Sequence, residues 1–317
     1  MGGKAIKIAE RVHKDKFFEY AKEIIPRVQS AFQTEVHMVN GFHNKESFGD
    51  IDLLVLDKGF KNRRETIEKE FHPDEISPNS NTISFNYNEL QVDLIFTPEE
   101  NWGASKIFFD WGDLGNFIGK LMNNYGKLDG YLLKYGFDGL KCRIVYSGQA
   151  KNITITKDNR KVFDFVGLDF EQWKKGFNEK EDMFNYVIGS KYFDYRDFQW
   201  ENLSSINKQR NKKRPNYQVF LDYMENHKKT NDWNKGEDYY LNEFKKFFGV
   251  DLKKEREDFI KEVELEKLDA EKFNGKLVMQ EFPELKGKEL GDTMKGFKTY
   301  INNVISSWDE YVKDNDR

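Results

Sequence analysis

The stretch Ser47-Phe-Gly-Asp50-Ile-Asp52-Leu-Leu-Val55 decides how the rest of the chain is interpreted. Its aliphatic run after Gly49 predicts a β-strand, in which side chains alternate between two faces. The aliphatic side chains then point into a core, while Asp50 and Asp52 project together from the opposite face. Two carboxylates so placed repel each other unless a divalent cation lies between them. Mg²⁺ commonly takes one or two carboxylates together with substrate phosphates.

A second strand carries a third carboxylate. In Leu90-Gln-Val-Asp93-Leu-Ile-Phe96, apolar residues occupy one face and Asp93 the other. If the two strands are neighbours, Asp93 completes a cluster able to hold two metal ions, which can activate a hydroxyl and stabilise a leaving oxygen. The Asp-x-Asp spacing alone is not specific, because Asp314 and Asp316 repeat it near the C-terminus.

The periodicity of the remaining sequence predicts an α+β fold that becomes mostly helical beyond about residue 160. Two strand-like runs around residue 88 are spaced as a hairpin. The predicted helices cover 15–33, with Pro26 as a kink, about 61–71, 113–125 and 128–136; the predicted strands cover 36–38, 50–56, 82–87, 89–96, 141–146 and 152–156.

Composition excludes several classes of protein. The 317 residues, of which 28 are Phe, 15 Tyr and 6 Trp, are too aromatic for a disordered chain. The single cysteine, Cys142, rules out an internal disulfide and a multi-cysteine zinc site. No apolar run reaches the ~18 residues that span a bilayer, and the N-terminus lacks the apolar core of a secretory signal. We therefore expect a cytoplasmic protein with no membrane partner.

The segment from Asn40 to Leu54 (Asn-Gly-Phe-His-Asn-Lys-Glu-Ser-Phe-Gly-Asp-Ile-Asp-Leu-Leu) resembles the nucleotidyltransferase signature of the DNA polymerase β superfamily, in its family X branch. The similarity continues upstream at Arg11 and downstream through 92–95, 107–116 and 153–168, about half of the chain. It implies a polymerase β-like palm over 1–105, a small fingers-like subdomain over 106–168 and a helical C-terminal domain over 169–317.

The resemblance also implies an activity and its residues. Asp50, Asp52 and Asp93 would bind two Mg²⁺ ions, for which Mn²⁺ could substitute, and Asp93 would help to activate a primer 3′-hydroxyl. The partners would be a (d)NTP and either a DNA primer–template or an RNA or tRNA 3′ end. The positions that match nucleotide-binding residues of the family are Arg11, Asn40, His43, Ser47, Gly49, Phe109, Asp113 and Asn116.

Two departures from the family pattern affect the phosphate clamp and the grip on DNA. Val39-Asn40 stands where the family has Gly-Ser, and His43 stands near its arginine. The Asn40 amide can still donate a hydrogen bond, and either His43 or Lys45 would carry the positive charge. Only ten residues precede Arg11, so the lyase and helix-hairpin-helix modules of repair polymerases have no counterpart upstream of it. Gap-filling repair is therefore not implied.

Nucleic-acid binding would then fall to other basic residues, although the net charge is only −4. Lys120 falls where the family tends to contact the template. The run Ile206–Arg214 holds five cations and no acid, and each phosphate they neutralise would add salt-dependent affinity; a solvated helix face is the alternative. The candidate contacts in this run are Lys208, Arg210, Lys212, Lys213 and Arg214.

A shorter similarity near the C-terminus keeps a second function open. Phe273-Asn-Gly and Gly287-Lys-Glu-Leu-Gly291 resemble an element of the helical region of CCA-adding tRNA nucleotidyltransferases, with Gly287 expected at a helix start. An ordinary loop is the alternative. Three functions therefore remain: a family X-like DNA polymerase, an RNA or tRNA 3′-end nucleotidyltransferase, and a catalytically inert nucleic-acid-binding module.

Overall fold

The computed structural model describes residues 5–212, 214–272 and 275–315. Backbone contacts divide the chain into two compact units. Unit 1 is Met1–Ile144 with Asn152–Asp251, and unit 2 is Val145–Lys151 with Leu252–Arg317. The three-part division expected from the resemblance, with boundaries after residues 105 and 168, stays a prediction.

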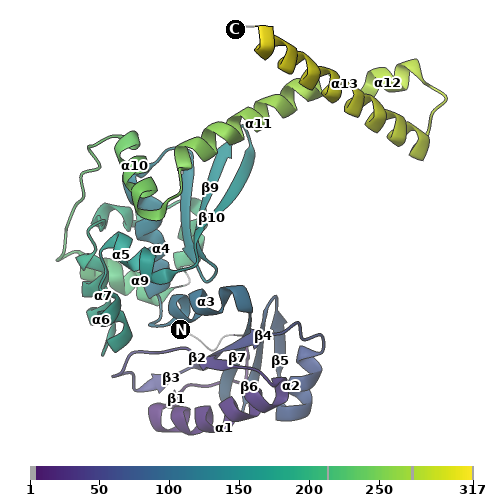
Figure 1. Ribbon diagram of the computed structural model, residues 1–317. Coiled ribbons are helices and arrows are strands. Elements are labelled where there is room, and N and C mark those ends of the chain that lie inside the picture. Colours follow the sequence, from purple (N-terminus) through teal and green to yellow (C-terminus); the bar gives the residue numbers. More distant parts are fainter. Residues whose placement is uncertain (1–4, 213, 273–274, 316–317) are drawn as a thin grey trace. The chain divides into compact units, whose positions relative to one another are not determined.

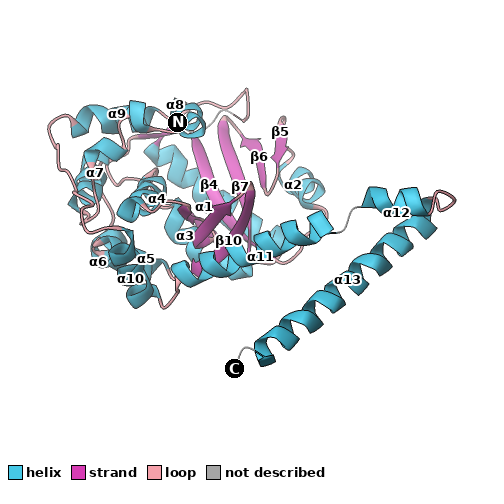
Figure 2. Ribbon diagram, turned by 90° about the horizontal axis from the view of Figure 1, so that it is seen from above, coloured by secondary structure: helices cyan, strands magenta, loops and turns pink. Residues whose placement is uncertain are grey.

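The N-terminal part of unit 1 is built on a mixed five-stranded sheet in the order β2-β4-β7-β6-β5. Its strands are β2 (Val36–Met38), β4 (Asp50–Asp57), β5 (Ile76–Asn79), β6 (Thr82–Tyr87) and β7 (Leu90–Pro98). The central pair, β4 and β7, is parallel and the other pairs are antiparallel (Figure 2). The predicted hairpin of β6 and β7 is confirmed, and so is the condition that the two aspartate-bearing strands are neighbours.

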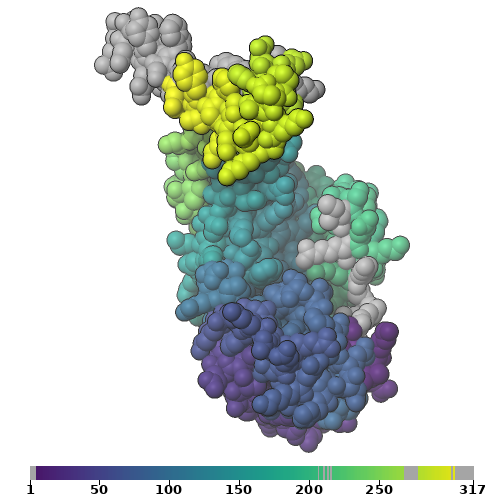
Figure 3. All heavy atoms as spheres, turned by 90° about the vertical axis from the view of Figure 1, so that its right-hand side faces the viewer, coloured from purple at the N-terminus to yellow at the C-terminus, as the bar shows by residue number. Residues whose placement is uncertain are grey.

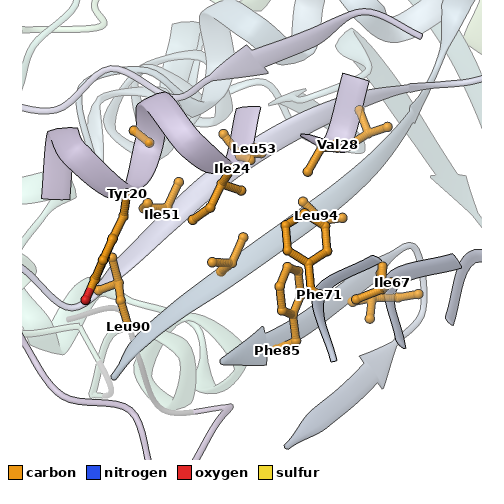
Figure 4. Packing of buried hydrophobic residues seen from close by; sticks show 14 of the residues in the cluster. Tyr20, Ile24, Val28, Ile51, Leu53, Ile67, Phe71, Phe85, Leu90 and Leu94 are labelled. Atoms are coloured by element: carbon orange, nitrogen blue, oxygen red, sulfur yellow. The ribbon is translucent and has the colours of Figure 1, made fainter. Parts of the chain in front are cut away.

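Two helices, α1 (Lys14–Phe32) and α2 (Arg63–Phe71), cover one face of this sheet (Figure 1). Ile24 and Val28 of α1 lie over Ile51 and Leu53 of β4, as Figure 4 shows, and all four are fully buried. These are the inward residues expected from the alternation of the strand. The opposite face packs Leu54, Ile95 and Trp102, the last from α3 (Trp102–Phe109), which sequence periodicity did not predict.

A second sheet follows α4 (Leu114–Asn124), in the order β10-β9-β8. Its strands are β8 (Tyr131–Gly136), β9 (Gly139–Tyr146) and β10 (Gln149–Thr156). The predicted helix over 128–136 is wrong, because β8 occupies this segment. Tyr131, Leu133 and Tyr135 are buried and the residues between them exposed, a two-residue period that specifies a strand.

The rest of unit 1 is helical, as predicted: the described residues after 156 contain no strand. The helices are α5 (Asn159–Val166), α6 (Phe170–Lys175), α7 (Lys180–Gly189), α8 (Ser205–Lys212), α9 (Pro215–Met224) and α10 (Glu237–Phe248), with short 3₁₀ turns at Glu99–Asn101, Tyr125–Lys127, Tyr195–Asp197 and Trp200–Asn202. A two-stranded pair, β1 (Val12–His13) and β3 (Ser47–Phe48), completes the elements of this unit. In Figure 3 the N-terminal residues, in purple and blue, form one continuous body of side chains.

Unit 2 consists of α11 (Leu252–Lys272), α12 (Gly275–Glu281), α13 (Gly287–Asn315) and the tip of the β9–β10 hairpin. The Tyr146 hydroxyl donates to Glu264 at 3.0 Å, and Lys151 pairs with Glu255 at 3.2 Å, so the tip is held on α11. Helix α13 begins at Gly287, as expected. Of the C-terminal similarity, Phe273 and Asn274 lie outside the described residues. No described helix combines the length and the apolar character that crossing a bilayer needs.

Candidate metal centre and its surroundings

The parallel pairing of β4 and β7 assembles the three carboxylates. In this register Asp52 lies directly opposite Asp93, and Asp50 lies two residues earlier on the same face of β4. One carboxylate oxygen from each residue lies within 4.8 Å of the others, close enough for all three to bind a metal ion. Carboxylate oxygens are the hard ligands that Mg²⁺ and Mn²⁺ prefer. The donor set thus fits the expected type of cation, while its identity is not shown.

The electrostatics of the cluster favour a bound cation. Burial, followed by the charges of Asp50 and Asp93, raises the pKa of Asp52 to about 8. Burial also raises the pKa of Asp93, although hydrogen bonds from Ser84 and Gln91 oppose that rise. Crowded carboxylates that cannot all ionise together are a source of raised pKa values. A divalent cation removes the repulsion, so proton release should accompany metal binding.

Gln91 orients Asp93, a role that the sequence analysis missed. The Gln91 amide Nε2 donates to both carboxylate oxygens of Asp93, at 2.9 and 3.0 Å. Its Oε1 accepts from the backbone N–H groups of Ala5 and Ile6, both at 3.0 Å. With the side chain 2% exposed, the amide orientation is fixed from both ends. The signal was available, since Gln91 stands two residues before Asp93 and therefore shares its face.

Arg11 and Ser47, two of the positions matched to nucleotide-binding residues, lie together. Nη2 of Arg11 donates to the Ser47 carbonyl at 2.6 Å and to its hydroxyl at 3.1 Å. The cause is the β1–β3 pair, which places residue 12 opposite residue 48 and so carries Arg11 to the segment that precedes Gly49 and Asp50. Gly49 is buried between β3 and β4.

Lys45, the alternative to His43 as the carrier of positive charge, is a further cation at this site. Its Nζ lies 4.3 Å from the ring centroid of Phe48. Burial lowers the pKa of Lys45, the carboxylates of Asp50 and Asp52 oppose that effect, and the charge of Arg11 adds to it. Lys45 and Arg11 therefore bring positive charge to the carboxylate cluster, as a phosphate-bearing substrate would require.

Asn40 and His43 are held by the protein itself. The Asn40 backbone N–H and its side-chain amide donate to the two carboxylate oxygens of Asp110, each at 2.8 Å. Asp110 is 2% exposed and was missed by the sequence analysis. His43 packs edge-to-face on Trp111 at 5.4 Å, and its Nδ1 lies 3.3 Å from the Asn178 carbonyl oxygen Oδ1. Both residues thus brace the loop between β2 and β3, and Asn40 keeps one amide N–H for a ligand.

The other positions matched to nucleotide-binding residues, Phe109, Asp113 and Asn116, lie around the start of α4. Asp113 accepts from Asn116 at 3.2 Å and from Arg214 at 2.6 Å. Arg214 had been assigned to nucleic-acid binding, but its guanidinium is paired with Asp113 and 27% exposed. Phe109, at the end of α3, is partly buried against Leu54 and its neighbours on the sheet.

The described ones among the remaining basic candidates lie on two different helices, α4 and α8. Lys120 is half-buried on α4, and burial lowers its pKa. On α8, Lys208 donates to the Glu201 carbonyl at 3.2 Å, and Lys212 is exposed. The Arg210 side chain and Lys213 lie outside the described part of the chain. Their assignment to nucleic-acid binding stays a prediction.

Comparison with known proteins adds no further constraint. A scan against models of protein families finds no match, and neither does a search of curated proteins. The geometry of the carboxylate cluster and its cationic surroundings is therefore the basis on which a function is assigned.

Proposed function

We propose that the protein is a Mg²⁺-dependent nucleotidyltransferase with a polymerase β-like palm, which transfers a nucleoside monophosphate from a (d)NTP to the 3′-hydroxyl of a nucleic acid. The observation that supports this proposal above all others is the convergence of Asp50, Asp52 and Asp93 within 4.8 Å from two adjacent parallel strands. The Arg11 guanidinium and the Lys45 ammonium beside the cluster favour a substrate rich in phosphate.

In the transfer, the 3′-oxygen forms a bond to the α-phosphorus, the bond between that phosphorus and the bridging oxygen breaks, and pyrophosphate leaves. Two Mg²⁺ ions, when bound, supply neutralisation of the phosphates and a lower pKa for the attacking hydroxyl. Asp93, aligned by Gln91, holds that hydroxyl in position and accepts its proton. Catalysis of this kind is mostly positioning and charge stabilisation.

The protein's cations would act on the leaving group. The Arg11 fork, already ordered on Ser47, offers planar donors that match phosphate oxygens. Lys45 supplies a point charge beside Asp50 and Asp52. Together they would supply the contacts of the family's arginine and serine clamp, because its counterparts His43 and Asn40 make hydrogen bonds within the protein.

A primer-extension assay tests the proposal. The protein, Mg²⁺ and each NTP or dNTP are incubated with a labelled primer, alone or annealed to a template, and in parallel with tRNA. Extension that follows the template identifies a polymerase, and ribonucleotide addition confined to tRNA identifies a 3′-end transferase. Absence of product from every substrate, with nucleic-acid binding retained, would identify the inert binding module and overturn the proposal.

Matched variants make the assay specific. Asp50→Asn and Asp93→Asn each remove one carboxylate of the cluster and should abolish extension. Asp164→Asn makes the same chemical change on the exposed surface of α5 and should leave extension unchanged. Full activity in both cluster variants would show that these carboxylates are not the catalytic ones.

A further inference from the structure

A pocket lies at the C-terminal end of α4, where Tyr125 follows the helix. Its volume is about 210 Å³, and its walls combine aromatic rings with polar and charged side chains. All the residues that line the pocket belong to unit 1. Helix α4 is 11 residues long, so Tyr125 at its C-terminal end lies about 16 Å from its N-terminal end at ~1.5 Å per residue. The pocket is thus distinct from the carboxylate cluster. The aromatic residues in its walls are Tyr125, Tyr192, Trp233, Tyr239 and Tyr240.

These rings pack on one another as a built surface. Tyr125 is 1% exposed, and its hydroxyl donates to the Tyr240 carbonyl at 3.0 Å, which fixes the floor. The centroids of Tyr125 and Tyr192 are 4.8 Å apart, and those of Tyr192 and Trp233 are 5.7 Å apart. The Trp233 indole N–H is buried and meets no hydrogen-bond acceptor within the described part of the chain. The indole N–H groups of Trp111 and Trp173 are in the same state, so the pocket is identified by its packed rings and not by this donor.

Two lysines at the rim decide which kind of ligand the rings can accept. The Lys191 ammonium lies 4.9 Å from the Tyr192 centroid, and the Lys235 ammonium lies 4.4 Å from that of Tyr239. These cations already occupy ring faces that a quaternary ammonium or methylated lysine would need. A neutral planar ring can stack on the remaining aromatic surface, and a flanking anion is attracted by both lysines.

The acids of the pocket also fit a planar ring with amino groups. Asp232 and Glu243 line the same cavity. Carboxylates accept hydrogen bonds from exocyclic amino groups of bases. A volume of about 210 Å³ is below the ~300–1,000 Å³ of pockets for drug-sized ligands, which favours one ring system over a whole nucleotide.

We propose that this aromatic pocket binds an unpaired base of a single-stranded nucleic acid, with the neighbouring phosphates on Lys191 and Lys235. Sequence-tolerant single-strand binding combines aromatic stacking with basic residues that follow the backbone. The choice of a nucleic acid as occupant rests on the proposed function. The pocket would hold an unpaired part of the substrate strand away from the carboxylate cluster.

The test is a binding measurement that needs no catalysis. Fluorescein-labelled 12-mers of oligo(dA) and oligo(A) are titrated with the full chain in EDTA, and anisotropy is recorded. Tyr239→Ala removes a ring that is 40% exposed and should weaken binding about 5- to 150-fold. Tyr300→Ala, which removes a ring 68% exposed on α13, is the matched control and should bind as the unaltered protein does. The two oligomers distinguish a DNA from an RNA ligand.

Two further variants separate the site from general charge and from folding. The double variant Lys191→Gln/Lys235→Gln loses two phosphate contacts. The slope of log binding constant against log salt concentration should therefore become shallower by about 1.4, at ~0.7 per contact to a single strand. The fluorescence of Trp233 should be quenched when the oligonucleotide binds. Trp233→Phe should fold normally, and the oligonucleotide should then quench the tryptophan fluorescence of the protein less.

Unchanged affinity in Tyr239→Ala, or an unchanged salt slope in the lysine variant, would overturn the inference. Displacement of the oligonucleotide by a trimethyl-lysine peptide would reassign the pocket to a cationic ligand. Failure of this site is distinguishable from failure of the proposed function, because oligonucleotide binding is measured in EDTA and primer extension is measured separately with Mg²⁺.

Discussion

Asp52→Asn should stabilise the metal-free protein at pH 8 while it abolishes metal binding. The substitution keeps the size of the side chain and removes one of three carboxylates that lie within 4.8 Å. Because burial and the charges of Asp50 and Asp93 raise the pKa of Asp52 from 3.8 to about 8, the folded state binds this proton more tightly than the unfolded state does. The stability contribution of Asp52 is therefore greatest below pH 4 and falls as the pH rises towards 8.

The size of the effect follows from the shift. Four pKa units correspond to about 5 kcal/mol at ~1.36 kcal/mol per unit, an upper bound because water reaches the half-buried cluster. We expect about 2–4 kcal/mol of destabilisation in the metal-free protein between pH 5 and pH 8, most of which Asp52→Asn removes. Saturating Mg²⁺ at 100 times its Kd should add ~2.7 kcal/mol to the unaltered protein and nothing to the variant.

Urea unfolding in EDTA at pH 5 and pH 8, followed by circular dichroism, measures both quantities, and repetition in Mg²⁺ measures the linkage. Asp164→Asn, exposed on α5, is the control for the loss of a negative charge. If the free energy of unfolding falls by the same amount from pH 5 to pH 8 in Asp52→Asn and in the unaltered protein, the electrostatic account of the cluster is refuted. A variant that Mg²⁺ still stabilises fully would refute the metal assignment.

Three other changes test the surroundings of the cluster. Gln91→Ala should weaken metal binding about 10- to 100-fold, because Gln91 orients the metal ligand Asp93. Calorimetric titration with Mn²⁺ measures this, and an unchanged affinity would contradict the prediction. Arg11→Ala should raise the KM for the nucleotide more than it lowers kcat, because Arg11 binds the phosphates of the substrate in the ground state. Steady-state kinetics in which kcat falls more than KM rises would contradict this, and would show that Arg11 acts mainly in the transition state. Asp110→Ala leaves the donors of Asn40 without acceptors and should cost about 1–3 kcal/mol in urea unfolding, whereas a loss below 0.5 kcal/mol would show that water replaces the carboxylate.

Several parts of the fold followed from local sequence. Strand β4 and helix α1 were predicted within two residues of their ends, because a period of two or of 3.6 in apolar residues is set by the local backbone. The same principle was misapplied at 128–136. Tyr131, Leu133 and Tyr135 alternate with outward residues, and the turn-forming Asp129-Gly130 precedes them, so the signal for β8 was present.

The candidate site was predicted in its acidic residues and missed in its supporting ones. The aspartates could be found because each interrupts an aliphatic strand, where a charge is costly without a partner. Gln91 and Asp110 were missed, although the position of Gln91 two residues before Asp93 was a local signal. Both residues acquire their place through contacts with residues distant in the sequence, Gln91 with Ala5 and Asp110 with Asn40.

Sequence alone therefore determined which strands carry the carboxylates and which of their faces is apolar, because alternation along a strand is a local property. Only the tertiary structure decided that β4 and β7 are parallel neighbours with Asp52 opposite Asp93, and that Arg214 pairs with Asp113. Strand partners and ion pairs are chosen by the packing of both sheet faces and by segments distant in the sequence, such as Asp113 and Arg214, which are 101 residues apart. No local pattern encodes that choice.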